Sequence, residues 1–175
     1  MSDADIIAAL REKMATPVGR HLYAVLGDYA GLARFADSLR QARTPDGIPF
    51  PVALSVNRGI LKTIPDEEFR RLTEDEARRP PSAVTAVGRA LDAFLRGALE
   101  GSPVLVLRGL EMLIVYQIDF APFRSLATDA RRIVLLLPGR RERDTIVLFE
   151  EADGVSHRLP ANLIAENHVW QLGPR

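Results

Sequence analysis

The spacing of apolar residues changes several times along the chain, and each spacing predicts one type of secondary structure. Apolar residues three or four positions apart predict amphipathic helices, as where Ile6, Leu10 and Met14 fall on one side of the first segment. The helices expected from this pattern cover residues 1–19, 57–79, 82–100, 110–126 and 161–165, together with a helix that follows Asp28.

Short apolar runs bounded by turn residues predict strands. The expected strands are His21–Leu26, Pro51–Val56, Val104–Leu107, Ile133–Gly139, Thr145–Phe149 and His168–Leu172. Val104–Leu107 and Ile133–Gly139 are continuously apolar, so we expect both strands to be buried on both faces of a parallel sheet. The last strand is expected at an edge of the sheet.

Strands and helices alternate through most of the length, which predicts an α/β fold with a three-layer, mostly parallel, doubly wound sheet. Only five residues separate Gly139 from Thr145, too few for a helical crossover. The Thr145–Phe149 strand is therefore expected to pair antiparallel with its predecessor, as a hairpin in the C-terminal part. The length fits a single α/β domain over residues 1–175, with residues 1–19 as an N-terminal helix.

Composition narrows the classes of function. The chain has 23 basic and 23 acidic side chains, and this balance argues against direct binding of nucleic acid. It has no cysteine, so disulfides and thiol chemistry are excluded. The acidic, amphipathic N-terminal segment is not a secretory signal, and every apolar run is shorter than the ~20 residues that cross a bilayer. We expect a cytoplasmic protein that does not enter a membrane.

The stretch LYAVLGDYAGLARF, residues 22–35, has the order strand, glycine-containing turn and helix that is typical of phosphate-binding loops. The candidate loop positions are Gly27, Asp28 and Gly31. Leu32 and Ala33 follow the second glycine, where a Walker A loop has Lys and Ser or Thr. The carboxylate of Asp28 would repel a phosphate while it caps the helix. We expect a degenerate loop with a structural role and no bound cofactor.

The partner motif is also incomplete. A Walker B strand ends in an acid that holds Mg²⁺, whereas the strand Val104–Leu107 runs into Arg108. Glu111 comes three residues after that position. The loss of both motifs favours a protein that is not an enzyme. A nucleotide-binding regulator, or a weak ATPase with an unorthodox loop, is the alternative.

No other pattern in the sequence predicts catalysis or metal binding. His21, His157 and His168 lack the spacing of metal ligands, and no serine lies in a GxSxG motif. We therefore expect no catalytic residue and no metal site.

The segment GRRERD follows the apolar strand that ends at Gly139, and Arg140, Arg141 and Arg143 are expected to project from an exposed loop. These three arginines are the candidates for binding a partner, through an acidic protein surface or a phosphate backbone. A solvated hairpin turn, or a nucleic-acid module, would carry the same residues.

The order of these pieces resembles the small P-loop-type subunits of BREX phage-defence systems, of the BrxF type and more loosely the BrxB type. The resemblance rests on the Gly27 loop, on VALSVNRGILKTI as a strand running into a helix, and on VLVLRGLEMLIVYQIDFAPFRSL. It also includes RRIVLLLPG and DTIVLF, and it covers residues 22–160.

The resemblance implies a P-loop or RecA-type domain that works in a cytoplasmic antiviral assembly. Its partners there would be a PglZ-like protein of the alkaline-phosphatase type, a large ATPase and a methyltransferase. The degenerate Walker motifs then indicate a non-catalytic adaptor or scaffold that binds another protein of the complex.

Overall fold

The computed structural model describes residues 1–75, 80–143, 145–149, 157–160 and 163–173. The helices are α1 (Asp3–Ala15), α2 (Tyr29–Gln41), α3 (Val56–Thr63), α4 (Asp66–Asp75), α5 (Pro80–Gly101), α6 (Glu111–Val115), α7 (Ala121–Leu126) and the 3-10 helix η2 (Glu166–His168). The strands are β1 (Leu22–Gly27), β2 (Leu54–Ser55), β3 (Val104–Arg108), β4 (Arg132–Glu142), β5 (Thr145–Leu148), β6 (His157–Pro160) and β7 (Val169–Gln171).

Five strands form a parallel sheet in the order β2–β3–β4–β1–β7. β4 continues beyond this sheet and pairs antiparallel with β5, which in turn pairs with β6. The expected α/β fold, with a mostly parallel sheet and a C-terminal hairpin, is therefore confirmed, as is the place of the last strand at an edge. β1 and β4 lie side by side in parallel, with Leu22 opposite Ile133 and Leu26 opposite Leu137.

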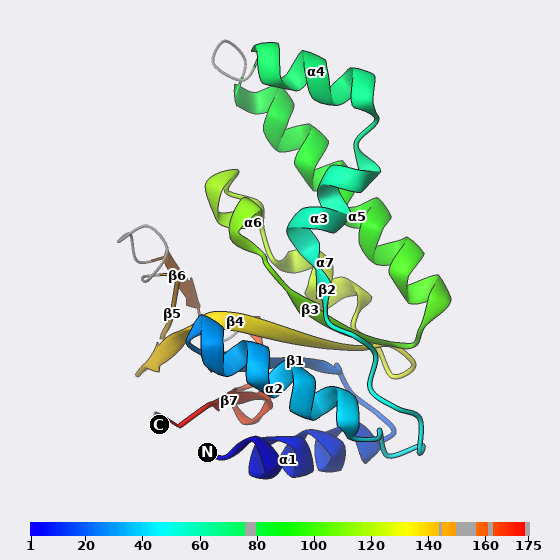
Figure 1. Cartoon of the computed structure of the whole chain (residues 1–175), viewed down its shortest axis with the longest axis vertical. Helices are drawn as coiled ribbons and strands as arrows, with labels where there is room; N and C mark the ends of the chain where they lie inside the picture. Colours follow the sequence, from blue (N-terminus) through cyan, green and yellow to red (C-terminus); the bar gives the residue numbers. More distant parts are fainter. Residues whose placement is uncertain (76–79, 144, 150–156, 161–162, 174–175) are drawn as a thin grey trace.

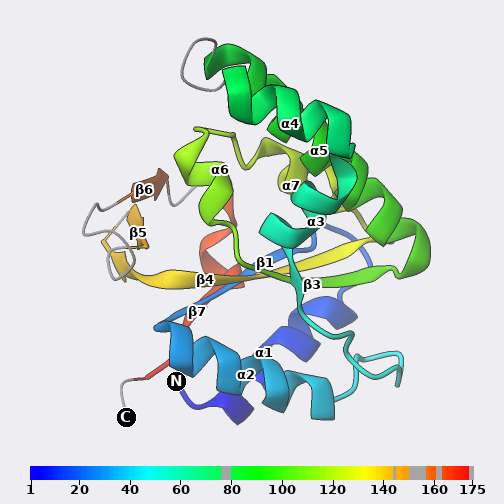
Figure 2. The same cartoon turned by 45° about the horizontal axis from the view of Figure 1, so that its top comes forward.

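Helices cover both faces of the sheet (Figure 1). α1 and α2 pack on one face, where Tyr23, Val25 and Leu136 meet Ile6 and Phe35 in one apolar cluster. α3, α5, α6 and α7 cover the other face, and Figure 2 shows the sheet between these two helical layers. β1 is buried along its length from Leu22 to Leu26 because both faces are covered.

Some element boundaries differ from the sequence-based expectation. The second strand shrinks to two residues because Ser55 caps α3, with its side-chain oxygen 3.3 Å from the Arg58 nitrogen. Over its described part, the polar helix expected over 57–79 is two helices, separated at Ile64 and Pro65, and positions 76–79 lie outside the described residues. α5 begins at Pro80 rather than at Ser82, because a helix tolerates proline in its first turn.

Two further differences lie in the second half. The helix expected over 110–126 is divided into α6 and α7, and Gln117 between them has a φ of 53°. Instead of the helix expected at 161–165, the described residues show the 3-10 helix at Glu166–His168, and positions 161 and 162 lie outside them. Strand β6 had no counterpart in the prediction.

The topology determines where a ligand site would lie. The chain leaves β1 through α2 on one face, whereas residues that follow β4, such as Ile146 and Leu148, join the core of the opposite face. β1 and β4 are neighbours, so the connections diverge between them. In α/β sheets, ligands bind outside the carboxyl ends of the strands at such a switch point.

Candidate functional site

The β1–α2 turn lies at this switch point, and its acid is bonded to the helix. Asp28 is the N-cap of α2, and its Oδ1 accepts a hydrogen bond from the Gly31 nitrogen at 2.5 Å. The cap satisfies one of the unpaired amides of the first helical turn and places a negative charge at the positive end of the helix. A phosphate would need the same amide and the same position.

The two glycines of the turn have packing roles. A Cβ at Gly27 would lie 2.9 Å from Cδ1 of Leu172, and one at Gly31 would lie 2.8 Å from the Asp28 carboxylate. Leu172 is held there by a hydrogen bond of 2.9 Å from its nitrogen to the Leu26 carbonyl oxygen. Packing of Leu172 and of the cap therefore accounts for both glycines without a bound phosphate.

A second acid is bonded to two neighbouring segments. Glu111 accepts hydrogen bonds from the Tyr29 hydroxyl at 3.1 Å and from Nδ2 of Asn57 at 2.7 Å. Asn57 Oδ1 accepts from the Met112 nitrogen at 3.1 Å, and the Asn57 nitrogen donates to the Gly109 carbonyl at 2.9 Å. We call Tyr29, Asn57 and Glu111 the carboxyl-edge network, because they follow β1, β2 and β3.

Sequence reasoning noted Glu111 and missed its two partners. Tyr29 and Asn57 each stand two residues past the end of a strand, and polar residues there are the signal that could have identified them. Since both oxygens of Glu111 already have donors, the carboxylate is committed to joining three segments of the fold. Among the described residues, no group of three or more His, Cys, Asp or Glu could hold a metal ion.

Arg108 is the last residue of β3, one position beyond the expected strand, and its side chain is exposed. It borders a small hollow of about 70 Å³ at the carboxyl edge. The other lining residues are Tyr29, Leu32, Ala33, Leu136 and Pro138.

The expectation that three arginines project from a loop is wrong in part. Arg140 and Arg141 belong to β4, which extends to Glu142, and successive side chains of a strand point to opposite faces. Arg140 pairs with Glu142 at 2.7 Å, whereas Arg141 approaches Glu166 at 3.8 Å. Arg143 alone lies in the turn, with a φ of 50°. Partner binding by these residues stays a prediction.

Two of the three histidines meet around a buried tyrosine. Nδ1 of His21 lies 2.6 Å from the Tyr23 hydroxyl, and the ring of His168 is 4.7 Å from that of Tyr23 between centroids. Burial, followed by the charge of Arg132, lowers the pKa of His21. Burial also lowers the pKa of His168 and raises the pKa of Tyr23 to about 12. His157 lies apart, in β6.

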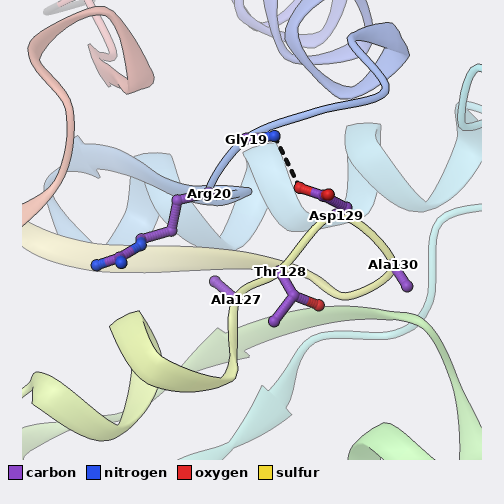
Figure 3. A pocket seen from close by; sticks show the side chains of 6 residues that line it. All are labelled: Gly19, Arg20, Ala127, Thr128, Asp129 and Ala130. Atoms are coloured by element: carbon purple, nitrogen blue, oxygen red, sulfur yellow. Dashed lines mark hydrogen bonds between the residues drawn. The ribbon is translucent and has the colours of Figure 1, made fainter.

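A larger hollow of about 370 Å³ lies at the opposite, amino edge of the sheet (Figure 3). Its rim is closed by a hydrogen bond of 2.8 Å from the Gly19 nitrogen to Oδ1 of Asp129. The Arg20 side chain extends away from Asp129 in Figure 3, so the two charges do not converge on one point. This shallow hollow is remote from the switch point, and it lacks the converging polar groups of a ligand site.

Comparisons with protein-family models, with curated proteins and with solved structures gave no match for the chain. Across the described residues, no helix combines the length and the apolar character that crossing a membrane requires.

The role of Asp28 as a cap can be measured through stability. We expect Asp28→Ala to lower the free energy of unfolding by about 1 kcal/mol, because an N-cap acceptor is lost. Asp28→Asn should keep most of that stability, since Asn caps equally well. Asp37→Ala removes an exposed carboxylate of the same helix and should change stability by less than about 0.5 kcal/mol. Equal effects of the two alanine substitutions in urea unfolding would contradict the cap.

The buried His21 and the half-buried His168 predict a dependence of stability on pH. The folded-state pKa values of His21 and His168 lie below the ordinary value of 6.5, so below about that pH the unfolded chain binds more protons than the folded one. The free energy of unfolding should be constant above pH 6.5 with respect to these groups and should fall as the pH decreases. Urea unfolding from pH 8 to pH 5 measures it. His21→Gln should flatten the slope, whereas an equal flattening in His157→Gln would overturn the assignment.

Proposed function

We propose that the chain is a non-catalytic adaptor or scaffold subunit of a bacterial antiviral, BREX-like complex. The observation that carries the proposal is the internal pairing of both acids at the switch point. Asp28 bonds the helix amide that a phosphate would need, and Glu111 bonds Tyr29 and Asn57. A site for nucleotide hydrolysis needs amides and an acid that are open to phosphate and Mg²⁺.

The positions of the lysine and arginine side chains also support a protein that binds a partner and does not hydrolyse a nucleotide. The only lysines of the sequence, Lys13 and Lys62, belong to α1 and α3, and neither lies in the β1–α2 turn. The position where a Walker B acid would stand is occupied by Arg108. The P-loop-like order of elements is thus present without the charges that hold Mg²⁺ and the terminal phosphate.

The resemblance to BREX subunits supports the proposal that the assembly is an antiviral complex of the BREX type. Its pattern contains a second strand that runs into a helix, and β2 does run directly into α3. It also contains an apolar strand followed by a short one, which corresponds to β4 and β5. The partner is then another cytoplasmic protein of the defence complex, with the PglZ-like phosphatase-fold protein as the first to test. Arg140 and Arg143 are the exposed arginines of the hairpin and remain the predicted contacts.

Co-expression with a PglZ-like protein encoded beside this chain tests the proposal. We expect a complex of fixed stoichiometry in size-exclusion chromatography with light scattering, formed equally with and without ATP and Mg²⁺. Replacing Arg140 and Arg143 together by alanine should weaken the complex at least tenfold, whereas Arg124→Ala, an exposed arginine of α7, should not.

Two outcomes would contradict the proposal. One is the absence of a complex with any protein encoded beside the chain. The other is saturable binding of ATP in calorimetry that is lost in Gly27→Val, which would favour the nucleotide-binding regulator instead.

A further inference from the structure

The hollow beside Arg108 differs from the rest of the carboxyl edge because the Arg108 guanidinium is not paired with another described residue. Asp28 and Glu111 are bonded within the fold, and Arg140 pairs with Glu142. The Arg108 side chain is exposed, and among the described residues it has no hydrogen-bond or ion-pair partner. A guanidinium in this position offers several N–H donors in the planar arrangement that a carboxylate matches.

The walls of the hollow are mainly apolar. Leu32 and Ala33 come from α2, while Leu136 and Pro138 come from β4, so the space lies between the first helix after the switch point and the central strand. The ring of Tyr29 completes the wall on the side of the carboxyl-edge network. All lining residues belong to regular elements, and the Tyr29 hydroxyl is also held by its hydrogen bond to Glu111, so the backbone around the space is preformed.

The volume of the hollow limits which group can occupy it. The volume of about 70 Å³ exceeds the space that a single water needs, roughly 10–15 Å³ on the same measure. It is far below the ~300–1,000 Å³ of pockets that enclose small-molecule ligands such as nucleotides. An aliphatic side chain of a partner, such as that of leucine or valine, matches both limits.

We infer that this hollow is the anchor of the partner interface, and that it takes an aliphatic side chain whose neighbouring carboxylate pairs with Arg108. The partner segment is therefore apolar and acidic, with Leu, Ile or Val beside Asp, Glu or a chain end. The inference rests on the proposed adaptor function and names the chemistry of its partner. The position fits the predicted hairpin contacts, because Pro138 lines the hollow and Arg140 follows two residues later in β4.

Two small probes separate the apolar contact from the ionic one. N-acetyl-leucine carries the side chain and a carboxylate, and N-acetyl-leucinamide carries the side chain alone. In ¹H–¹⁵N spectra, N-acetyl-leucine should shift the amides of Tyr29, Ala33 and Arg108, with a Kd on the order of millimolar. The amide should bind about tenfold more weakly, since a charge-assisted hydrogen bond is lost.

Matched variants assign the two contacts. Arg108→Gln should remove the preference for the carboxylate probe. Ala33→Leu should fill the hollow and abolish binding of both probes, whereas Ala30→Leu, on the same helix and outside the lining, should leave binding unchanged. Leucine has a high helix propensity, so we expect both variants to fold and the difference between them to report on binding. Shifts elsewhere, or binding that survives Ala33→Leu, would overturn the anchor.

The same variants keep this inference distinct from the proposed function. If the Ala33→Leu variant still forms a normal complex with the PglZ-like protein, the adaptor function stands and the inferred anchor is contradicted. A complex that never forms contradicts the adaptor function itself, and with it the anchor, whatever the small probes do.

Discussion

The Glu111 carboxylate is the point at which the segments after three parallel strands are held together. Its two oxygens accept from Tyr29 after β1 and from Asn57 after β2, while Glu111 itself follows β3. Parallel strands bring their carboxyl ends to one edge, where the divergence of two connections leaves room for a ligand. Here protein groups occupy that room instead: Glu111 pairs with Tyr29 and Asn57, and Asp28 accepts the Gly31 amide.

The carboxyl edge is therefore divided into a closed part and an open part. In the closed part, the Asp28 cap, the Leu172 side chain over Gly27 and the Glu111 network satisfy or cover the groups that a phosphate would meet. In the open part, Arg108 stands beside a small apolar hollow. The proposed adaptor function would use the open part of this edge, where the inferred anchor takes a side chain of a partner.

Much of the fold follows from local patterns in the sequence. The continuous apolar runs of β3 and β4 predicted strands buried on both faces, and the five residues before Thr145 predicted the hairpin. The Asp28 cap was also predictable, because a cap is formed by residues three apart. The two-residue β2 was not, since the Ser55 cap starts a helix inside an apolar run.

The candidate site was less predictable because it depends on distant contacts. Glu111 meets Tyr29 across 82 positions and Asn57 across 54, so only the order of the strands brings them together. The hairpin arginines look alike in sequence, yet the extension of β4 past Gly139 sends Arg140 and Arg141 to different neighbours. β4 extends to Glu142, whereas the apolar run in the sequence ends at Gly139. The sequence pattern therefore predicted a strand that was too short and placed both arginines in a loop.

The most direct measurement is a titration of the ¹⁵N-labelled protein with ATP and Mg²⁺, following the backbone amides from Gly27 to Gly31. If the turn is closed by its own cap, these amides keep their chemical shifts at millimolar nucleotide. Saturable shifts at these amides would show that the turn still accepts phosphate, and would contradict the account of a loop with a structural role.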